Sequence, residues 1–167
     1  KVHHVHATAL NIDSRMQNAP MSFDTDSASI VCDNSANVHI CNNKSMFDGE
    51  IRPTSEHFVA TIGGSKNNVA RGMGTVVWSW KDDHGTVHKM RIHDVLYFPS
   101  SPVNILSVTS LALQVNGDGG TGIHTNGTTS RFYWDHGRFQ RTISHPSSNL
   151  PELPINEGFP LQVSFPR

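Results

Sequence analysis

The chain has 167 residues, of which 36% are hydrophobic and only 16% are charged, and this length suits one domain. Thirteen Lys and Arg against 14 Asp and Glu give a formal net charge of −1. Nucleic-acid binders neutralise phosphates with clustered basic residues, so this balance argues against a nucleic-acid partner. No apolar run approaches the roughly 18 residues of a membrane span, so we expect no membrane partner either.

Short β-type segments separated by turn residues dominate the sequence. The expected strands are residues 28–32, 57–62, 75–80, 86–92, 95–98 and 130–134. Leucines at helical spacing predict one short helix near residues 107–113. The predicted fold class is therefore mostly β, a closed barrel of short antiparallel strands with one short helix.

Both ends of the chain differ from its middle. We divide the sequence into an N-terminal arm, 1–22, a central domain, 23–143, and an extended C-terminal arm, 144–167, with five prolines. Leu161, Val163 and Phe165 alternate, so they share one face of a short strand. We expect residues 144–167 to be ordered only through contact with another copy of the chain.

Neither the cysteines nor the histidines form a recognisable metal site. Cys32 and Cys41 are too few for a four-cysteine zinc site, although one disulfide between them stays open. His3, His4 and His6 lack a carboxylate or cysteine partner, which favours a solvated arm. We therefore expect no metal and no cofactor.

The most informative segment is an apolar strand that ends in Asp33 and is followed by small polar residues. An aspartic protease needs such a strand to deliver a carboxylate to a loop whose amides hold it. Two carboxylates about 3 Å apart then share one proton. The chain offers one such element, so the site would form between two copies. The simpler alternative is an Asx-turn after a strand.

Three blocks follow one another along the chain: Asp33-Asn34-Ser35-Ala36-Asn37-Val38-His39, then Gly72-Met73-Gly74-Thr75-Val76, then Val95-Leu96-Tyr97-Phe98-Pro99 with Asn104-Ile105-Leu106-Ser107-Val108. In order and spacing they resemble the retropepsin-like aspartic protease of copia-type retrotransposon polyproteins. That family's blocks run Asp-Ser-Gly-Ala-Ser/Thr-x-His, Gly-x-Gly-x-Val, and Val-Leu-Tyr-x-Pro with Asn-Leu-Leu-Ser-Val. The resemblance spans roughly residues 23–141.

The resemblance implies a role for each matching residue. Asp33 would be the catalytic carboxylate, in a loop with Asn34, Ser35 and Ala36. The flap that closes over a bound peptide would extend from about residue 62 to residue 74 and include Ile62, Gly63, Gly64, Gly72, Met73 and Gly74. The apolar turn and helix start beneath the active loop would be Asn104, Ile105 and Leu106.

Two positions depart from the family pattern. Asn34-Ser35 replaces Ser/Thr-Gly, and Ser35 adds a Cβ where the family carries none. The leading function is an aspartic endopeptidase of a retrotransposon polyprotein, active as a homodimer on a polypeptide substrate. The alternative is a retropepsin-like domain with weak or no catalysis that serves as a structural, self-assembling subunit, even a filament.

The compartment depends on which function holds. A retroelement polyprotein fragment would be cytoplasmic, whereas a structural assembly could be extracellular. Asn43 and Asn126 each begin a glycosylation sequon, which matters only for a secreted chain. In either case the expected partner is a second copy of the chain.

Overall fold

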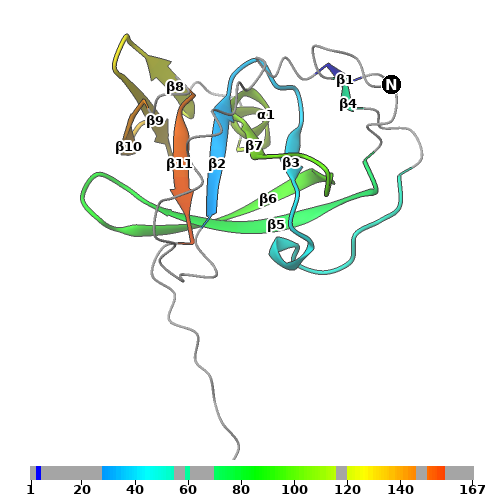
Figure 1. The fold of residues 1–167 in the computed structure, drawn as a ribbon. Coiled ribbons are helices and arrows are strands. Elements are labelled where there is room, and N and C mark those ends of the chain that lie inside the picture. The colour runs from blue at the N-terminus through cyan, green and yellow to red at the C-terminus, as the bar shows by residue number, and fades with distance from the viewer. Residues whose placement is uncertain are drawn as a thin grey trace, which may run out of the picture.

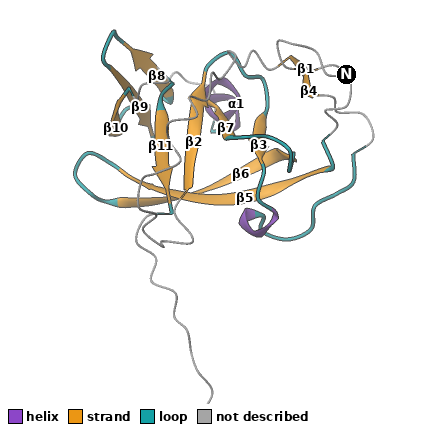
Figure 2. Ribbon diagram, viewed as in Figure 1, coloured by secondary structure: helices purple, strands orange, loops and turns teal. Residues whose placement is uncertain are grey.

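A computed structural model describes residues 28–54, 70–115, 120–145 and 150–156, together with two short strands near the N-terminus and after residue 58. The elements in chain order are β1 (His3–His4), β2 (Ala28–Asp33), β3 (His39–Cys41), the 3-10 helix η2 (Lys44–Met46), β4 (Val59–Ala60), β5 (Gly72–Lys81), β6 (Val87–Tyr97), β7 (Asn104–Ser107), α1 (Val108–Gln114), β8 (Gly122–Thr125), β9 (Thr129–Trp134), β10 (Phe139–Ser144) and β11 (Glu152–Ile155). The expected mostly-β fold class with one short helix is confirmed (Figure 2).

Six strands form the main sheet in the order β11-β2-β7-β3-β6-β5 (Figure 1). Antiparallel strands were expected, but the pairing is mixed. β2 pairs with β7 in parallel, and so does β3 with β6. β7 lies between β2 and β3, which follow each other along the chain. This insertion brings the end of β2 beside the start of α1.

The main sheet curls until its two edge strands meet. The backbone amide of Asn156, directly after β11, donates to the Ser79 carbonyl of β5 at 2.8 Å. The Asn156 side-chain oxygen accepts from the Ser79 amide at 3.2 Å and from its hydroxyl at 3.0 Å. Asn156 has a φ of 57°, a left-handed conformation that asparagine tolerates better than most residues. One residue thus joins the two edges of the barrel.

The expected hairpin between β5 and β6 is present. Its turn is closed by a hydrogen bond from the Asp82 amide to the Thr86 carbonyl at 3.0 Å, and Gly85 has a φ of 84°. The strands predicted at 86–92 and 95–98 are one strand, β6. A register shift against β5 and a φ of 55° at Asp94 place an irregularity between the two segments.

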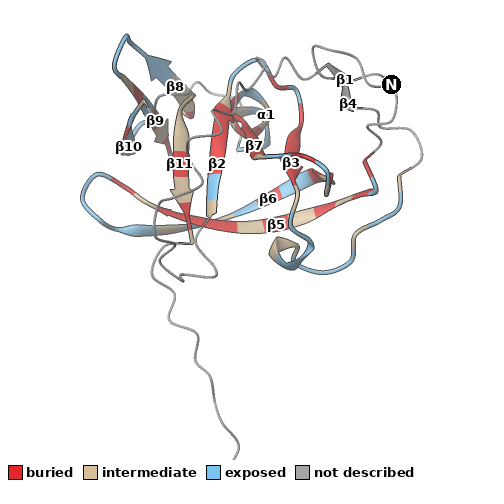
Figure 3. Ribbon diagram, in the orientation of Figure 1, coloured by how far each residue is buried: buried red, intermediate tan, exposed pale blue. Residues whose placement is uncertain are grey.

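The smaller sheet, β10-β9-β8, packs its aromatic side chains against the hairpin. Trp80 of β5 makes edge-to-face contacts with Phe132 at 5.6 Å and Trp134 at 5.9 Å between ring centroids. Trp78 and Trp80 share one face of β5 and are both buried, as their alternation predicts. The two sheets therefore share one core (Figure 3).

For residues 150–156, the structure corrects the expectation that the C-terminal arm needs another copy to become ordered. β11 pairs with β2 of its own chain, and Leu153 and Ile155 are fully buried. The Cys32 amide donates to the Pro151 carbonyl, so by alternation the missing N–H of Pro154 faces away from β2. An edge strand tolerates a proline in that position. Residues 157–167 lie outside the described part.

Candidate functional site at the end of strand β2

Asp33 is the last residue of β2, beside Ser107 of β7 in the parallel ladder. One carboxylate oxygen, Oδ1, accepts from the Ser35 amide at 2.8 Å and from the Ser35 hydroxyl at 2.6 Å. The other oxygen, Oδ2, has no hydrogen-bond partner among the described residues. The described part of the chain thus holds one oxygen of the carboxylate and places no hydrogen-bond partner on the other.

The loop after Asp33 is fixed to the β7–α1 junction. Three hydroxyl groups of that junction donate to three loop carbonyl oxygens: Ser107 to Ala36 at 2.6 Å, Ser110 to Asn37 at 3.0 Å, and Thr109 to Asn34 at 3.2 Å. Ser107 also caps α1, because its Oγ accepts the Ser110 amide at 3.2 Å. The sequence interpretation missed these hydroxyls, although a serine directly before a run of helical periodicity, as at Ser107, is a helix-start signal.

His39 is buried directly behind this loop. Its Nδ1 accepts a hydrogen bond from the Ser107 amide at 3.1 Å, and its Nε2 lies 3.4 Å from the side-chain nitrogen of Gln114. Burial lowers the pKa of His39 from 6.5 to about 4, so the imidazole is neutral at pH 7. The neutral ring leaves Nδ1 free to accept the amide. His39 closes the first sequence block but was assigned no role there.

Ser35 occupies its position without backbone strain. Its φ is not among the positive values of the described residues, so the added Cβ needs no glycine-like conformation. Its amide still reaches Asp33, and its hydroxyl adds a second donor that glycine lacks. Asn34 is exposed, and Ala36 is buried in a cluster that includes Ile40, beneath the loop.

The residues expected to support the loop have a different local structure from the predicted turn and helix start. Asn104, Ile105 and Leu106 form strand β7, paired with Ile30–Cys32 of β2. Ile105 and Leu106 face opposite sides of the sheet and belong to separate apolar clusters. The Asn104 side chain accepts the Asn42 amide at 2.9 Å and so fixes the chain after β3.

The expected flap residues fall in two groups. Gly72, Met73 and Gly74 begin β5 and pair with β6. A Cβ on Gly72 would lie 2.8 Å from the Arg52 carbonyl oxygen, and one on Gly74 would lie 2.9 Å from the Phe47 ring. These glycines therefore allow close packing in the sheet. Ile62, Gly63 and Gly64 lie outside the described residues.

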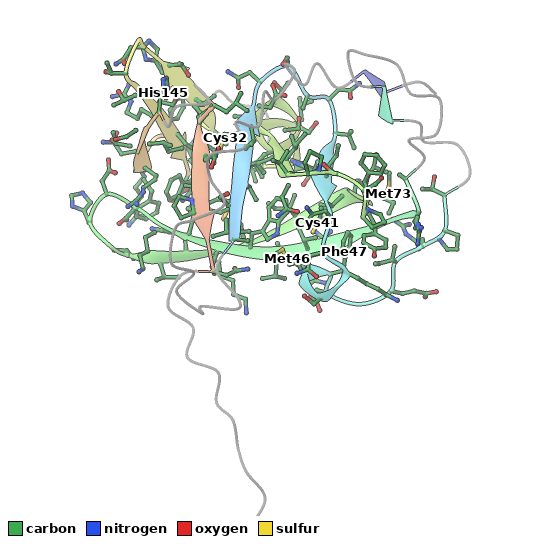
Figure 4. All side chains as sticks on the ribbon, in the orientation of Figure 1. Cys32, Cys41, Met46, Phe47, Met73 and His145 are labelled. Carbon is green, nitrogen blue, oxygen red and sulfur yellow. The ribbon has the colours of Figure 1, made fainter. Side chains whose placement is uncertain are left out.

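Cys32 and Cys41 are both buried free thiols. They lie on β2 and β3, and β7 runs between these strands (Figure 4). Two strand spacings, about 10 Å, exceed the roughly 7 Å between Cα atoms that a disulfide can bridge. Burial raises the pKa of Cys32 to about 12 and that of Cys41 to about 11. Neither thiol is a reactive nucleophile at neutral pH.

Among the described residues, the other candidate ligands gather into no further site. Within the described ranges, no three His, Cys, Asp or Glu side chains come together as a metal site. In the same part of the chain, no helix is long and apolar enough to cross a membrane. His3 and His4 form β1, which pairs in parallel with β4, while His6 lies outside the described residues. The sequon residues cap local turns: the side-chain oxygen of Asn43 accepts the Ser45 amide, and that of Asn126 accepts the Thr128 amide.

The chain belongs to the Pol polyprotein beta-barrel domain family, whose model matches residues 30–116. This match covers Asp33, its loop, the hairpin, β7 and α1. The chain is also 36% identical over 84 residues to a putative transposon Ty5-1 protein of Saccharomyces cerevisiae. The aligned region covers 50% of this chain and 50% of that relative, so the chain spans about half the relative's length. No solved structure matches the chain. The family and the relative support a retrotransposon polyprotein fragment.

Proposed function

We propose that this domain is the retropepsin-like aspartic protease of a copia-type retrotransposon polyprotein and that it acts as a homodimer. The observation that carries the proposal is the environment of Asp33. Its Oδ1 is held by Ser35, and Oδ2 has no partner in the described part of the chain. A carboxylate fixed on one side and open on the other can bind a water molecule and face a twin carboxylate.

The proposed reaction uses Asp33 from both copies. One carboxylate is ionised and the other is protonated, because two like charges so close together do not both ionise. The ionised Asp33 takes a proton from water as the water oxygen attacks the peptide carbonyl carbon. The protonated Asp33 donates its proton to the carbonyl oxygen. The Asp33 that took the water proton then gives it to the leaving nitrogen, the other Asp33 takes a proton from a hydroxyl of the tetrahedral intermediate, and the carbon–nitrogen bond breaks. One carboxylate is again ionised and the other protonated.

The neighbouring contacts support a rigid position for Asp33. The carbonyls of residues 34, 36 and 37 accept hydrogen bonds from the β7–α1 junction. Catalysis needs reacting groups to be held in a near-attack geometry, and small misplacements lower the rate severely. The three bonds and the parallel ladder to β7 supply such a support. Ser35 preserves the amide contact that the family's glycine provides.

The test is cleavage of a peptide library by the full chain, with products identified by mass spectrometry. Asp33→Asn should abolish cleavage and keep the fold, because it removes the ionisable group and preserves shape. The matched control is Asp94→Asn, an exposed residue whose positive φ asparagine also adopts. The wild-type rate should follow a bell-shaped pH profile that belongs to the pair of carboxylates. Wild-type cleavage by Asp33→Asn would refute the proposal.

A second candidate function is a structural, self-assembling subunit. It is favoured by a strand edge of β6 that has no partner along half its length in the described part of the chain. The two functions predict different assemblies. A protease dimer brings the two Asp33 carboxylates together across a twofold axis, whereas a purely structural assembly leaves them apart. A structure of the assembled protein distinguishes the two.

A further inference from the structure

A groove of about 510 Å³ lies beside the first half of β6, and Asp33 is not among the residues that line it. Its lining includes Lys89 and Met90 of β6, Val115 after α1, and the aromatic rings of Trp134 and Phe139. His88, which also lines it, packs against Trp134 and Phe139. Thr121, Asp135 and His136 also line it. The groove therefore combines an apolar, aromatic wall with polar residues and one side of a β-strand.

The backbone of β6 is open on the groove side. The Asp82–Thr86 hydrogen bond closes the hairpin, so alternation makes His88 and Met90 the residues bonded to β5. The amides and carbonyls of Val87, Lys89 and Arg91 then face the opposite edge. Ser79 supports this alternation. It lies opposite Lys89, and its amide and carbonyl bond to Asn156 on the far side of β5 and not to Lys89.

Among the described residues, only the second half of β6 has hydrogen-bond partners along this edge. β3 pairs with residues 95–97. At His93 the Gln114 side chain takes a strand's place, because its oxygen accepts the His93 amide at 3.3 Å and its nitrogen donates to the His93 carbonyl at 3.0 Å. For Val87, Lys89 and Arg91, no outward backbone partner exists among the described residues. Five residues of edge, 87–91, are left.

The C-terminal sequence matches this edge in length and pattern. Pro160 and Pro166 lack amide hydrogens and enclose five residues, 161–165, that have them. Leu161, Val163 and Phe165 are apolar, and the residues between them, Gln162 and Ser164, are polar and uncharged. A strand of this pattern can direct its apolar side chains into the groove and its polar ones toward solvent.

We propose that residues 161–165 of a second copy of the chain add to β6 as an antiparallel strand. Leu161, Val163 and Phe165 would pack over Met90, Trp134 and Phe139, on the inner face of the strand. Gln162 and Ser164 would exchange backbone hydrogen bonds with the open edge, beside the exposed Lys89 and Arg91. This is β-strand addition, in which backbone bonds give affinity and alternate side chains give specificity.

The tail of the same copy is too short for this position. Asn156 bonds to the far edge of β5, so three strand spacings, about 14 Å, separate it from a strand added to β6. In the proposed register Leu161 lies level with Ile92 and Val76, three residues or about 10 Å along β5 from Ser79. The straight line from Asn156 is therefore about 17 Å long and passes through the hairpin, so a real connection must be longer. The five residue steps from Asn156 to Leu161 span at most about 18 Å. A second copy must therefore supply the strand.

The contact joins two different surfaces, a tail and a groove. Two copies that exchange tails form a closed dimer, while one-way donation from copy to copy forms an open filament. In both cases the mass of the protein in solution depends on the tail. The contact is independent of Asp33, so loss of cleavage does not bear on it.

The test is amide hydrogen exchange of the full-length chain by nuclear magnetic resonance, at low and high protein concentration. At high concentration the amides of Lys89 and Arg91 should exchange at least about tenfold more slowly than at low concentration. The amides of His88 and Met90, bonded to β5, are internal controls and stay protected at both concentrations. Light scattering on the same samples should show a corresponding rise in mass.

Two substitutions of equal charge test whether residues 161–165 are the strand that adds to β6. Val163→Asp places a carboxylate on the apolar face and should abolish both the protection and the mass increase. Gln162→Asp places the same carboxylate one residue away, on the outer face near Lys89, and should preserve both. Both residues lie beyond the described fold. Fast exchange of Lys89 and Arg91 in the wild type, protection that survives Val163→Asp, or protection that is independent of concentration would each overturn the proposal.

Discussion

The buried His39 makes the stability of this domain depend on pH in a way that can be calculated. Burial lowers its pKa from 6.5 to about 4. Between these values the unfolded chain binds a proton at this site and the folded chain does not, so stability rises with pH over this range. Above pH 6.5 the contribution is fully present. It is lost as the pH falls toward 4.

The magnitude follows from the two pKa values. Each unit of separation corresponds to about 1.4 kcal/mol, so the full contribution of His39 is about 3 kcal/mol. Between pH 7 and pH 5 the loss is about 2 kcal/mol. That is a sizeable part of the 5–15 kcal/mol by which domains are usually stable. Burial causes this shift in the pKa. The geometry agrees with it, because a hydrogen on Nδ1 would point at the Ser107 amide, which is itself a donor.

The assay is urea unfolding followed by the fluorescence of the three tryptophans at pH 7 and pH 5. Other titrating groups also contribute, so the wild type is compared with His39→Asn, whose side-chain oxygen takes the place of Nδ1 as acceptor. The wild type should lose about 2 kcal/mol more than this variant between the two pH values. His124→Asn, at an exposed position, is the matched control and should behave like the wild type. An equal loss in the wild type and His39→Asn would refute the reasoning.

Two further predictions concern the closure and packing of the barrel. Asn156→Gly keeps the left-handed backbone but loses two side-chain bonds to Ser79, so urea unfolding should show a loss of about 1–3 kcal/mol in stability. Asn156→Ala should lose more, because alanine resists a φ of 57°. Equal stability of Asn156→Ala and the wild type would contradict this. Gly72→Ala brings a Cβ to 2.8 Å from the Arg52 carbonyl oxygen and should destabilise the domain by about 1–3 kcal/mol. Gly127→Ala, with open space around it, should change the midpoint little, and an equal effect of both alanines would contradict the packing argument.

The sequence located the candidate site better than it described the structure around it. The strand before Asp33, the hairpin with its Asp-Asp-His-Gly turn, and the helix after residue 107 are all local signals. Each depends on neighbouring residues alone: an apolar run, turn residues with their special backbone angles, or helical spacing. Position 35 was harder to judge, because only the structure shows that the Ser35 hydroxyl binds Asp33.

β7 shows why the remaining structure could not be obtained from the sequence. Asn104, Ile105 and Leu106 continue directly into the apolar pattern of α1, and a strand buried on both faces has no alternation to distinguish it from a helix. Its partners, β2 and β3, are distant in sequence: Asn104 pairs with Ile30 and Ile105 with Ile40. Tertiary pairing alone therefore decided where the strand ends and the helix begins.

The two halves of β6 and the proline-containing β11 illustrate the same limit. The sequence predicted two strands, 86–92 and 95–98, but β5 pairs along both segments and makes them one. The prolines of the C-terminal arm favoured a segment outside the barrel, yet Pro154 directs its missing donor away from β2. Local sequence determined the strand-forming segments, the turns and the carboxylate at the end of β2. The pairing of distant strands, which depends on long-range burial and hydrogen bonding, determined the barrel, its closure at Asn156 and the neutral state of His39.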